Sequence, residues 1–244
     1  MPQIAEASVR LLALVNGRQF STILADPPWR FANRTGKMAP EHMRLRRYPT
    51  MSFEEIYDLP LGEIAAPVAH LYLWCPNALL AEGLTTMQRW GFTYKTNIVW
   101  YKVRSDGGPD RRGVGFYFRN VTELLLFGVR GSGAAVRTLA PGRRQPNIIS
   151  TRKREHSRKP DESYPVIEAC SPGPYLELFA RNKRPGWEQW GDEIVPPPLG
   201  QAARYTAQPQ LTLGAISNAG IKPPRVSASP WQARANRPSP WASG

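Results

Sequence analysis

Short apolar runs alternate with longer polar or amphipathic segments over the first 180 residues of the chain. Apolar runs of this kind, bounded by Gly, Pro or polar residues, are typical of buried β-strands. We therefore expect strands at residues 20–25, 71–74, 97–100, 124–129 and 175–180.

Helical segments fall between these strands. Ser52 can cap a short helix that starts at Phe53, and Asn77 can cap a helix over residues 78–90 that Gly91 ends. A proline at position 160 favours the start of a third helix, over residues 161–169. Strands that alternate with helices predict an α/β domain with a mostly parallel sheet covered on both faces.

The composition changes near residue 195. Residues 196–244 contain nine prolines, five basic residues and no acidic residue. Such a segment buries too little apolar surface to offset the entropy lost on folding. We expect one folded catalytic domain over residues 1–195 and a Pro-rich, disordered tail over residues 196–244.

The formal net charge of +13 indicates a polyanionic partner, because a basic protein gains affinity by releasing counterions from phosphates. The basic residues are concentrated: residues 30–48 hold six against one acid, and residues 102–154 hold twelve against three. Both stretches also carry aromatic residues, which suit base stacking. The pattern predicts a nucleic-acid groove, although an Arg-rich composition alone would also produce scattered surface charge.

Cysteine usage and hydropathy narrow the class of protein. Cys75 and Cys170 are far apart and lack ligand-like spacing, so we expect reduced core cysteines, no disulfide framework and no metal site. No apolar stretch approaches the length of a membrane span, and the first 16 residues make a poor signal peptide. The sequence predicts a cytoplasmic protein without membrane association.

The most informative motif is Asp26-Pro27-Pro28-Trp29, directly after the first predicted strand. A carboxylate, a rigid turn that offers only carbonyls and a flat aromatic ring could together hold a planar exocyclic amine. A fixed carboxylate also stabilises the positive charge that such a nitrogen gains as it attacks a methyl donor. The motif predicts an amino-methyltransferase, with an ordinary strand-to-loop turn as the alternative.

Further motifs in the same order strengthen this interpretation. With them, the chain resembles the N6-adenine methyltransferases of the mRNA-adenosine methyltransferase (MTA-seventy) family from about residue 20 to residue 193. The matching blocks are residues 23–29 (ILADPPW), 48–52 (YPTMS), 119–131 (RNVTELLLFGVRG), 156–161 (HSRKPD), 177–181 (ELFAR) and 187–193 (WEQWGDE).

The resemblance implies a Rossmann-like fold that binds S-adenosylmethionine, with the permuted motif order of the beta-class amino-methyltransferases. The catalytic tetrapeptide then precedes the cofactor-binding strand. The cofactor-binding positions that the resemblance implies are Asp26, Lys159, Phe179, Arg181, Asp192 and Glu193. Position 192 is more often Asn in the family, but a carboxylate can also accept from ribose hydroxyls.

The substrate would contact basic and aromatic positions in two loops and two charged positions near the site. We expect these to be Tyr48, Arg111, Arg112, Glu123 and Lys159. A charge at position 123 beside an apolar strand is costly unless it is paired, and Lys159 is its natural partner.

The sequence therefore predicts transfer of a methyl group from S-adenosylmethionine to the N6 amine of adenine in DNA. RNA is the first alternative, and a non-catalytic nucleic-acid-binding partner subunit is the second. A cytosine N4 or protein glutamine methyltransferase is the third alternative, although those enzymes usually carry Ser or Asn at the first motif position, where this chain has Asp26. A homodimer is left open.

Overall fold

The computed structural model describes residues 2–30, 50–110, 117–154 and 158–191. These residues form a seven-stranded sheet with the strand order β5-β3-β4-β2-β1-β6-β7. The strands are β1 (Phe20–Ala25), β2 (Ala65–Cys75), β3 (Thr93–Val103), β4 (Thr122–Arg130), β5 (Ile148–Arg152), β6 (Tyr175–Leu178) and β7 (Trp187–Trp190). The predicted boundary at residue 195 and the tail over 196–244 lie outside the described residues.

The sheet is mixed. β1 pairs in parallel with β2 and β6, β6 with β7, and β3 with β5, whereas β4 is antiparallel to both β2 and β3. Four of the six strand pairs are parallel, so the prediction of a mostly parallel sheet is confirmed, and β4 is the antiparallel exception. In the described residues no helix separates β3 from β4, and the Lys102 N–H donates to Val121 O (2.8 Å) where the two strands approach their connection. Strands joined without a helical crossover pair antiparallel.

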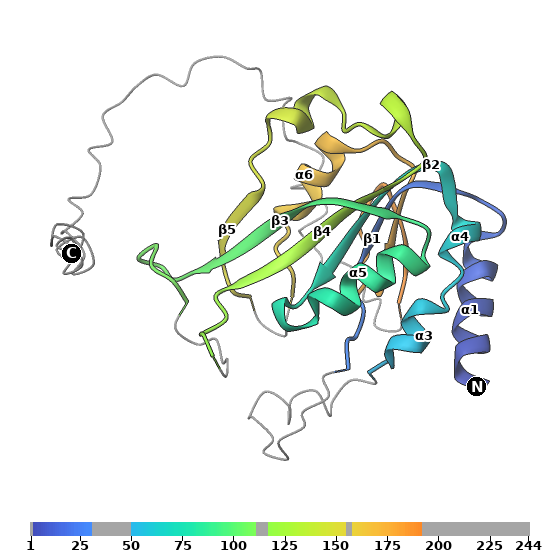
Figure 1. The fold of residues 1–244 in the computed structure, drawn as a ribbon, viewed down its shortest axis with the longest axis horizontal. Coiled ribbons are helices and arrows are strands. Elements are labelled where there is room, and N and C mark those ends of the chain that lie inside the picture. The colour runs from blue at the N-terminus through green and yellow to red at the C-terminus, as the bar shows by residue number, and fades with distance from the viewer. Residues whose placement is uncertain (1, 31–49, 111–116, 155–157, 192–244) are drawn as a thin grey trace, which may run out of the picture. The chain divides into compact units, whose positions relative to one another are not determined.

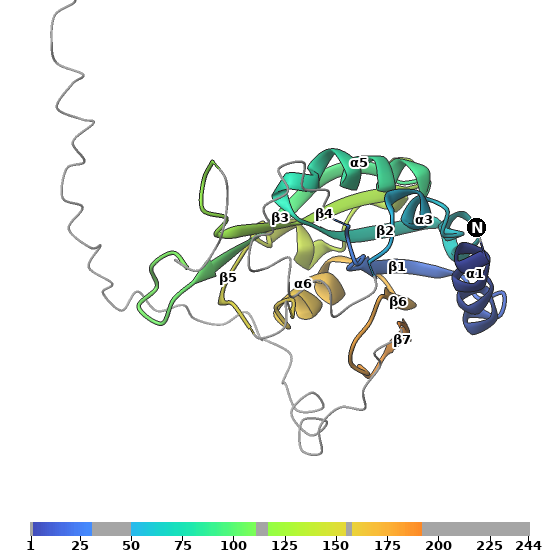
Figure 2. The same cartoon turned by 90° about the horizontal axis from the view of Figure 1, so that it is seen from below.

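Helices cover both faces of the sheet, as the alternation of elements predicts. Figure 2 shows α5 (Leu80–Arg89) and α3 (Phe53–Tyr57) on one face and α6 (Ser163–Cys170) on the other. The remaining helical elements are α1 (Pro2–Val15), α4 (Leu61–Ile64) and the 3₁₀ turns η1 (Asn77–Leu79), η2 (Gly133–Val136) and η3 (Ala140–Arg144). Their arrangement around the sheet can be followed in Figure 1.

Each face of the sheet has its own apolar core. Alternate side chains of β1 go to opposite faces: Ile23 and Ala25 pack in the cluster that includes α1, and Leu24 packs in the cluster that includes Ile167 of α6. Cys75 belongs to the first core, and both cysteines are buried and free, as predicted.

The local signals for helix ends are only partly correct. Ser52 caps α3 as predicted, and together with Glu55 it forms a reciprocal capping box. Gly91 has a φ of +82° after α5, the conformation that favours glycine at a helix end. The cap predicted for Asn77 is wrong. Its side-chain amide donates to Thr122 O (3.3 Å) and Thr122 Oγ1 (2.9 Å), so it joins η1 to β4 instead.

Candidate active site

Asp26 directly follows the last residue of β1, between the ends of two parallel neighbours. Ligand sites in sheets of this kind lie at the carboxyl ends of parallel strands. The Asp26 N–H approaches Leu178 O at the end of β6 (3.5 Å), and Ala25 pairs with Leu73 of β2. The motif thus stands at a position where the topology gathers residues from several segments.

The two prolines form a tight turn whose carbonyls already accept bonds from the chain. Pro27 O accepts from the Trp29 N–H (2.8 Å), and Pro28 O accepts from the Met51 N–H (3.1 Å). A carbonyl oxygen has two lone pairs, so Pro27 O keeps acceptor capacity. Its predicted bond to a substrate amine stays a prediction.

Trp29 is part of the core. Its side chain is only 5% exposed, its indole N–H donates to Trp74 O (2.9 Å), and its ring lies 6.5 Å from that of Phe53. These contacts link the motif to β2 and α3. In this arrangement the indole supports the turn that carries Asp26, and the predicted stacking on a base is limited to its small exposed edge.

Lys159 connects the motif to β4. Its ammonium nitrogen lies 2.7 Å from Asp26 Oδ1 and 3.1 Å from Glu123 Oε1. The predicted pairing of Lys159 with Glu123 is therefore confirmed. A second ammonium, that of Lys102, lies 2.9 Å from Glu123 Oε2 and was not among the predicted site residues.

Two tryptophan rings lie under these ammonium groups. The Lys159 nitrogen is 5.7 Å from the ring centre of Trp74, and the Lys102 nitrogen is 4.6 Å from that of Trp100. The two rings meet edge to face at 6.0 Å. Each cation thus contacts both a carboxylate and an aromatic face, which stabilises it in a site with little access to water.

The charges alter one another's protonation. Burial raises the pKa of Asp26, opposed by the charges of Lys159 and, more weakly, Arg181. For Glu123 burial is outweighed by Lys159 and Lys102, which lower its pKa to about 2. The pKa of Lys159 is raised against the effect of burial by Asp26 and Glu123. At neutral pH Glu123 and Lys159 are therefore charged and paired with each other.

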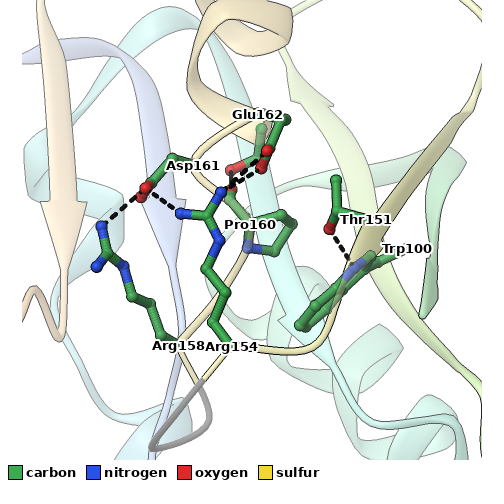
Figure 3. Close-up of polar contacts among 8 residues, drawn as sticks. Trp100, Thr151, Arg154, Arg158, Pro160, Asp161 and Glu162 are labelled. Carbon is green, nitrogen blue, oxygen red and sulfur yellow. Dashed lines mark hydrogen bonds and ion pairs between the residues drawn. The ribbon is translucent and has the colours of Figure 1, made fainter. Parts of the chain in front are cut away.

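The segment that carries Lys159 is fixed by an ion-pair cluster, shown in Figure 3. Arg154 pairs with Asp161 and with Glu162 (2.9 Å), and Arg158 pairs with Asp161 (2.7 Å). These contacts surround the short turn that Lys159 and its following proline make before α6. The turn replaces the first part of the predicted helix, because α6 begins only at Ser163.

The end of β6 has an unusual backbone. Phe179 has a φ of +62° and packs edge to face on Trp190 (5.3 Å), and the Ala180 N–H donates to Trp190 O (2.9 Å). A Cβ at Gly191 would lie 2.2 Å from Ala180 O, so only glycine allows this close approach. The predicted cofactor residues Phe179 and Arg181 are thereby brought beside the Asp26 end of the sheet.

Glu177 is a further, partly buried carboxylate, and the sequence motifs did not indicate a role for it in the site. Its two oxygens accept from the Tyr164 hydroxyl (2.7 Å) and the Gln189 amide (2.9 Å). Burial raises its pKa, and Asp26 contributes in the same direction. The signal that could have found it is the one used for Glu123, a charge inside an otherwise apolar strand.

Five of the predicted residues fall in other parts of the chain. Tyr48, Arg111, Arg112, Asp192 and Glu193 lie outside the described residues. Near the gap that contains Arg111, Tyr117 and Phe118 are 94% and 86% exposed. Among the described residues, no helix has the length and apolar character needed to cross a bilayer, and no three His, Cys, Asp or Glu side chains gather as metal ligands would.

Comparison with known proteins identifies the relatives of this chain. It is 28% identical to the type II methyltransferase M.MunI of Mycoplasma sp, over 72% of this chain and 78% of that protein. It is 28% identical to the MT-A70-like N(6)-adenosine-methyltransferase of Arabidopsis thaliana, over 86% of this chain and 28% of that protein. It is 29% identical to the human N(6)-adenine-specific methyltransferase METTL4, over 75% of this chain and 39% of that protein.

The chain thus spans well under half the length of the plant and human relatives that it matches. The MT-A70 family model matches residues 20–193, which includes every described element from β1 to β7. In that stretch the strand before Asp26 precedes the strand before Arg181, the permuted order that the motifs predict. The chain therefore belongs to the MT-A70 family, with the Rossmann-like α/β fold of a methyltransferase.

Proposed function

We propose that this protein transfers a methyl group from S-adenosylmethionine to the N6 amine of adenine in DNA. The observation that carries the proposal is the contact of Asp26, at the carboxyl end of β1, with Lys159, whose ammonium also binds Glu123. A partly buried carboxylate with a fixed cationic neighbour is suited to bind an amine and to stabilise charge on it.

Asp26 acts on the amine. One of its oxygens accepts from Lys159, and an ionised carboxylate has about four lone-pair sites, so it can also accept from an N–H of the target base. The nitrogen would become positive as its bond to the methyl carbon forms and the bond from that carbon to sulfur breaks, and it would then release one proton to solvent. The Asp26 carboxylate attracts the positive charge more strongly than it attracts the neutral amine. The difference lowers the barrier.

Lys159 and Trp29 hold Asp26 in place. The ammonium fixes one carboxylate oxygen, and the bond from the Trp29 indole to Trp74 O fixes the turn behind it. Good positioning of two reactants can lower a barrier by roughly 7–11 kcal/mol, provided the geometry is kept. The side chains of four charged residues at the site are only 14% to 24% exposed, which keeps water from weakening their interactions; they are Asp26, Lys159, Glu123 and Lys102.

The donor set fits the cofactor. S-adenosylmethionine, when bound, supplies an electrophilic methyl group on a sulfonium centre, and it also carries a carboxylate and an ammonium. Lys159 and Arg181 would bind the carboxylate, and Phe179 would lie against the apolar part. By resemblance to the family, Asp192 and Glu193 would accept from the ribose hydroxyls.

Charge and likeness support a nucleic-acid substrate. The net charge is +13, and the match to a type II methyltransferase over 78% of that protein's length favours DNA. RNA is the second candidate, because the chain matches N(6)-adenosine-methyltransferases at similar identity. An adenine in a duplex must leave the base stack before its amine can reach Asp26, at a cost of a few kcal/mol.

Mass spectrometry of nucleosides from cells that express the protein tests the proposal. N6-methyladenine should rise in DNA, with little change in N4-methylcytosine, and an Asp26→Ala variant should show no rise. A rise confined to RNA would make RNA the substrate. An equal rise with the Asp26→Ala variant would remove Asp26 from the mechanism.

A further inference from the structure

Lys102, near the end of β3, is the member of the charge cluster to which neither the motifs nor the proposed mechanism assigns a role. Its ammonium donates to Glu123 Oε2 (2.9 Å), and its side chain is 15% exposed. A lysine in this environment loses most of its hydration, and its contacts with the carboxylate and the aromatic ring offset that loss. It is therefore a built part of the site.

The pairing of β3 with β4 explains how Lys102 reaches this position. Trp100 lies opposite Glu123 across the two strands, so Lys102, two residues further along β3, is a diagonal neighbour on the same face. Trp100 itself is fixed, because its indole N–H donates to Thr151 Oγ1 (2.9 Å) on β5 (Figure 3). The ring that supports the Lys102 ammonium therefore has a defined place.

The four charges form an alternating row: Asp26, Lys159, Glu123 and Lys102. Each Glu123 oxygen binds a different ammonium, Oε1 that of Lys159 and Oε2 that of Lys102. Lys159 is shared between two carboxylates, and Glu123 between two ammonium groups. Without Lys102, all of the Glu123 charge would be directed at Lys159, in competition with Asp26.

We propose that Lys102 is a positioning residue that binds one oxygen of Glu123 and so leaves the Lys159 ammonium on Asp26, which keeps Asp26 ionised and oriented toward the amine. This inference rests on the proposed function for its catalytic consequence. The coupling of charges from Lys102 to Asp26 depends only on the contacts in the row.

The inference predicts a change in pH dependence. The charged groups that face Asp26 are Lys159 from the segment before α6, Glu123 from β4, and Glu177 and Arg181 from the end of β6. Removal of the Lys102 charge leaves an extra unpaired negative charge in this set. The pKa of Asp26, already raised by burial, should then rise further, so that activity is lost at a higher pH as the solution is acidified.

Three variants test the inference by kcat as a function of pH. In Lys102→Met the acidic limb of kcat should move to higher pH by about one pH unit, the lower end of what a nearby charge produces. Lys102→Arg keeps the charge, so its acidic limb should lie close to that of the wild type. Lys95→Met is the matched control: it removes the same charge from an exposed position on the same strand and should leave the limb unchanged.

The double variant Lys102→Met/Glu123→Gln separates charge balance from simple structural damage. In this variant the Asp26 carboxylate and the Lys159 ammonium remain as one balanced pair. The acidic limb of its kcat should therefore return toward that of the wild type, even if its maximal kcat is low. An unshifted limb in Lys102→Met, or the same shift in Lys95→Met, would overturn the inference.

A readout without activity separates this inference from the proposed function. The carboxyl carbon of Asp26, assigned in ¹³C-labelled protein by its loss in Asp26→Asn, should titrate at higher pH in Lys102→Met than in the wild type. This result would support the coupling even if the wild type transferred no methyl group. Identical titration curves in the two proteins would reject it.

Discussion

The Lys159 ammonium nitrogen lies 2.7 Å from Asp26 Oδ1, although the two residues belong to segments far apart in the chain. The contact joins the end of β1 to the turn before α6. The same ammonium also binds Glu123 on β4. Lys159 therefore connects the end of β1, strand β4 and the turn before α6 at one site.

Replacement of Asp26 by Asn keeps the shape of the side chain and removes its charge. We expect kcat to fall by about 10²–10³-fold or more, the range seen when one stabilising group is removed from a transition state. Cofactor affinity should change much less, because Asp26 acts mainly on the amine. Single-turnover kinetics and calorimetry with the cofactor measure the two effects.

Asp106→Asn is the matched control for this prediction, because Asp106 is an exposed carboxylate paired with Arg104 outside the site. It should retain the wild-type rate. Near-normal turnover of Asp26→Asn would show that the catalytic assignment is wrong.

Glu123 should contribute stability that disappears in acid. Its pKa is about 2 in the folded protein, below its ordinary value of 4.5. Ionised Glu123 therefore stabilises the fold fully above pH 4.5, and this contribution is lost as the pH falls from 4.5 to about 2. Glu123→Gln should lower the free energy of unfolding at pH 7 by about 3–5 kcal/mol. Urea titrations at pH 7, 5, 4 and 3 should show this difference shrinking. A difference that stays constant down to pH 3 would contradict the ion-pair account.

Trp29 should matter for stability as well as for substrate use. Trp29→Ala removes a buried side chain and should cost about 3–5 kcal/mol of unfolding free energy. Trp29→Phe keeps most of the packing but leaves Trp74 O without its indole donor, which should cost about 1–3 kcal/mol. Urea titration together with KM for an oligonucleotide separates the roles: a stable Trp29→Ala protein with only a raised KM would assign the indole to stacking alone.

The tail over residues 196–244 should be dispensable for folding and methyl transfer, whereas Arg111 and Arg112 should be needed for nucleic-acid binding. A protein that ends at residue 195 should fold and transfer methyl groups to a short oligonucleotide. Ala at both positions should weaken nucleic-acid binding and lower the slope of its salt dependence by about one for each phosphate that an arginine neutralises. Arg89→Ala on α5 is the control, since Arg89 lies over the Tyr57 ring. Loss of binding on truncation, with an unchanged salt slope in the double variant, would place the binding surface in the tail.

Local signals in the sequence predicted the parts of the site that depend on neighbours in the chain. The Ser52 cap and the turn after β1 follow from residues within a few positions of one another. The Lys159–Glu123 pair was predicted because a lone charge in an apolar strand requires a partner.

Lys102 and Glu177 were not predicted, for a different reason. The diagonal contact of Lys102 with Glu123 requires β3 and β4 to be antiparallel, whereas the alternation of elements favoured parallel strands. Glu177 is satisfied by Tyr164 and Gln189 from two other elements, and sequence spacing does not show such contacts. Strand β7 was also not predicted. It is only four residues long and lies at the edge of the sheet, so its sequence shows little of the apolar pattern that identifies a strand.

The most direct test of the account uses purified protein and S-adenosylmethionine with a deuterated methyl group. DNA and RNA oligonucleotides of the same adenine-containing sequence are incubated separately, digested to nucleosides and analysed by mass spectrometry. We expect the deuterated methyl group on N6 of adenine from DNA with the wild type and none with Asp26→Asn. No labelled adenine in either nucleic acid from folded wild-type protein, or label on cytosine in place of adenine, would contradict the account.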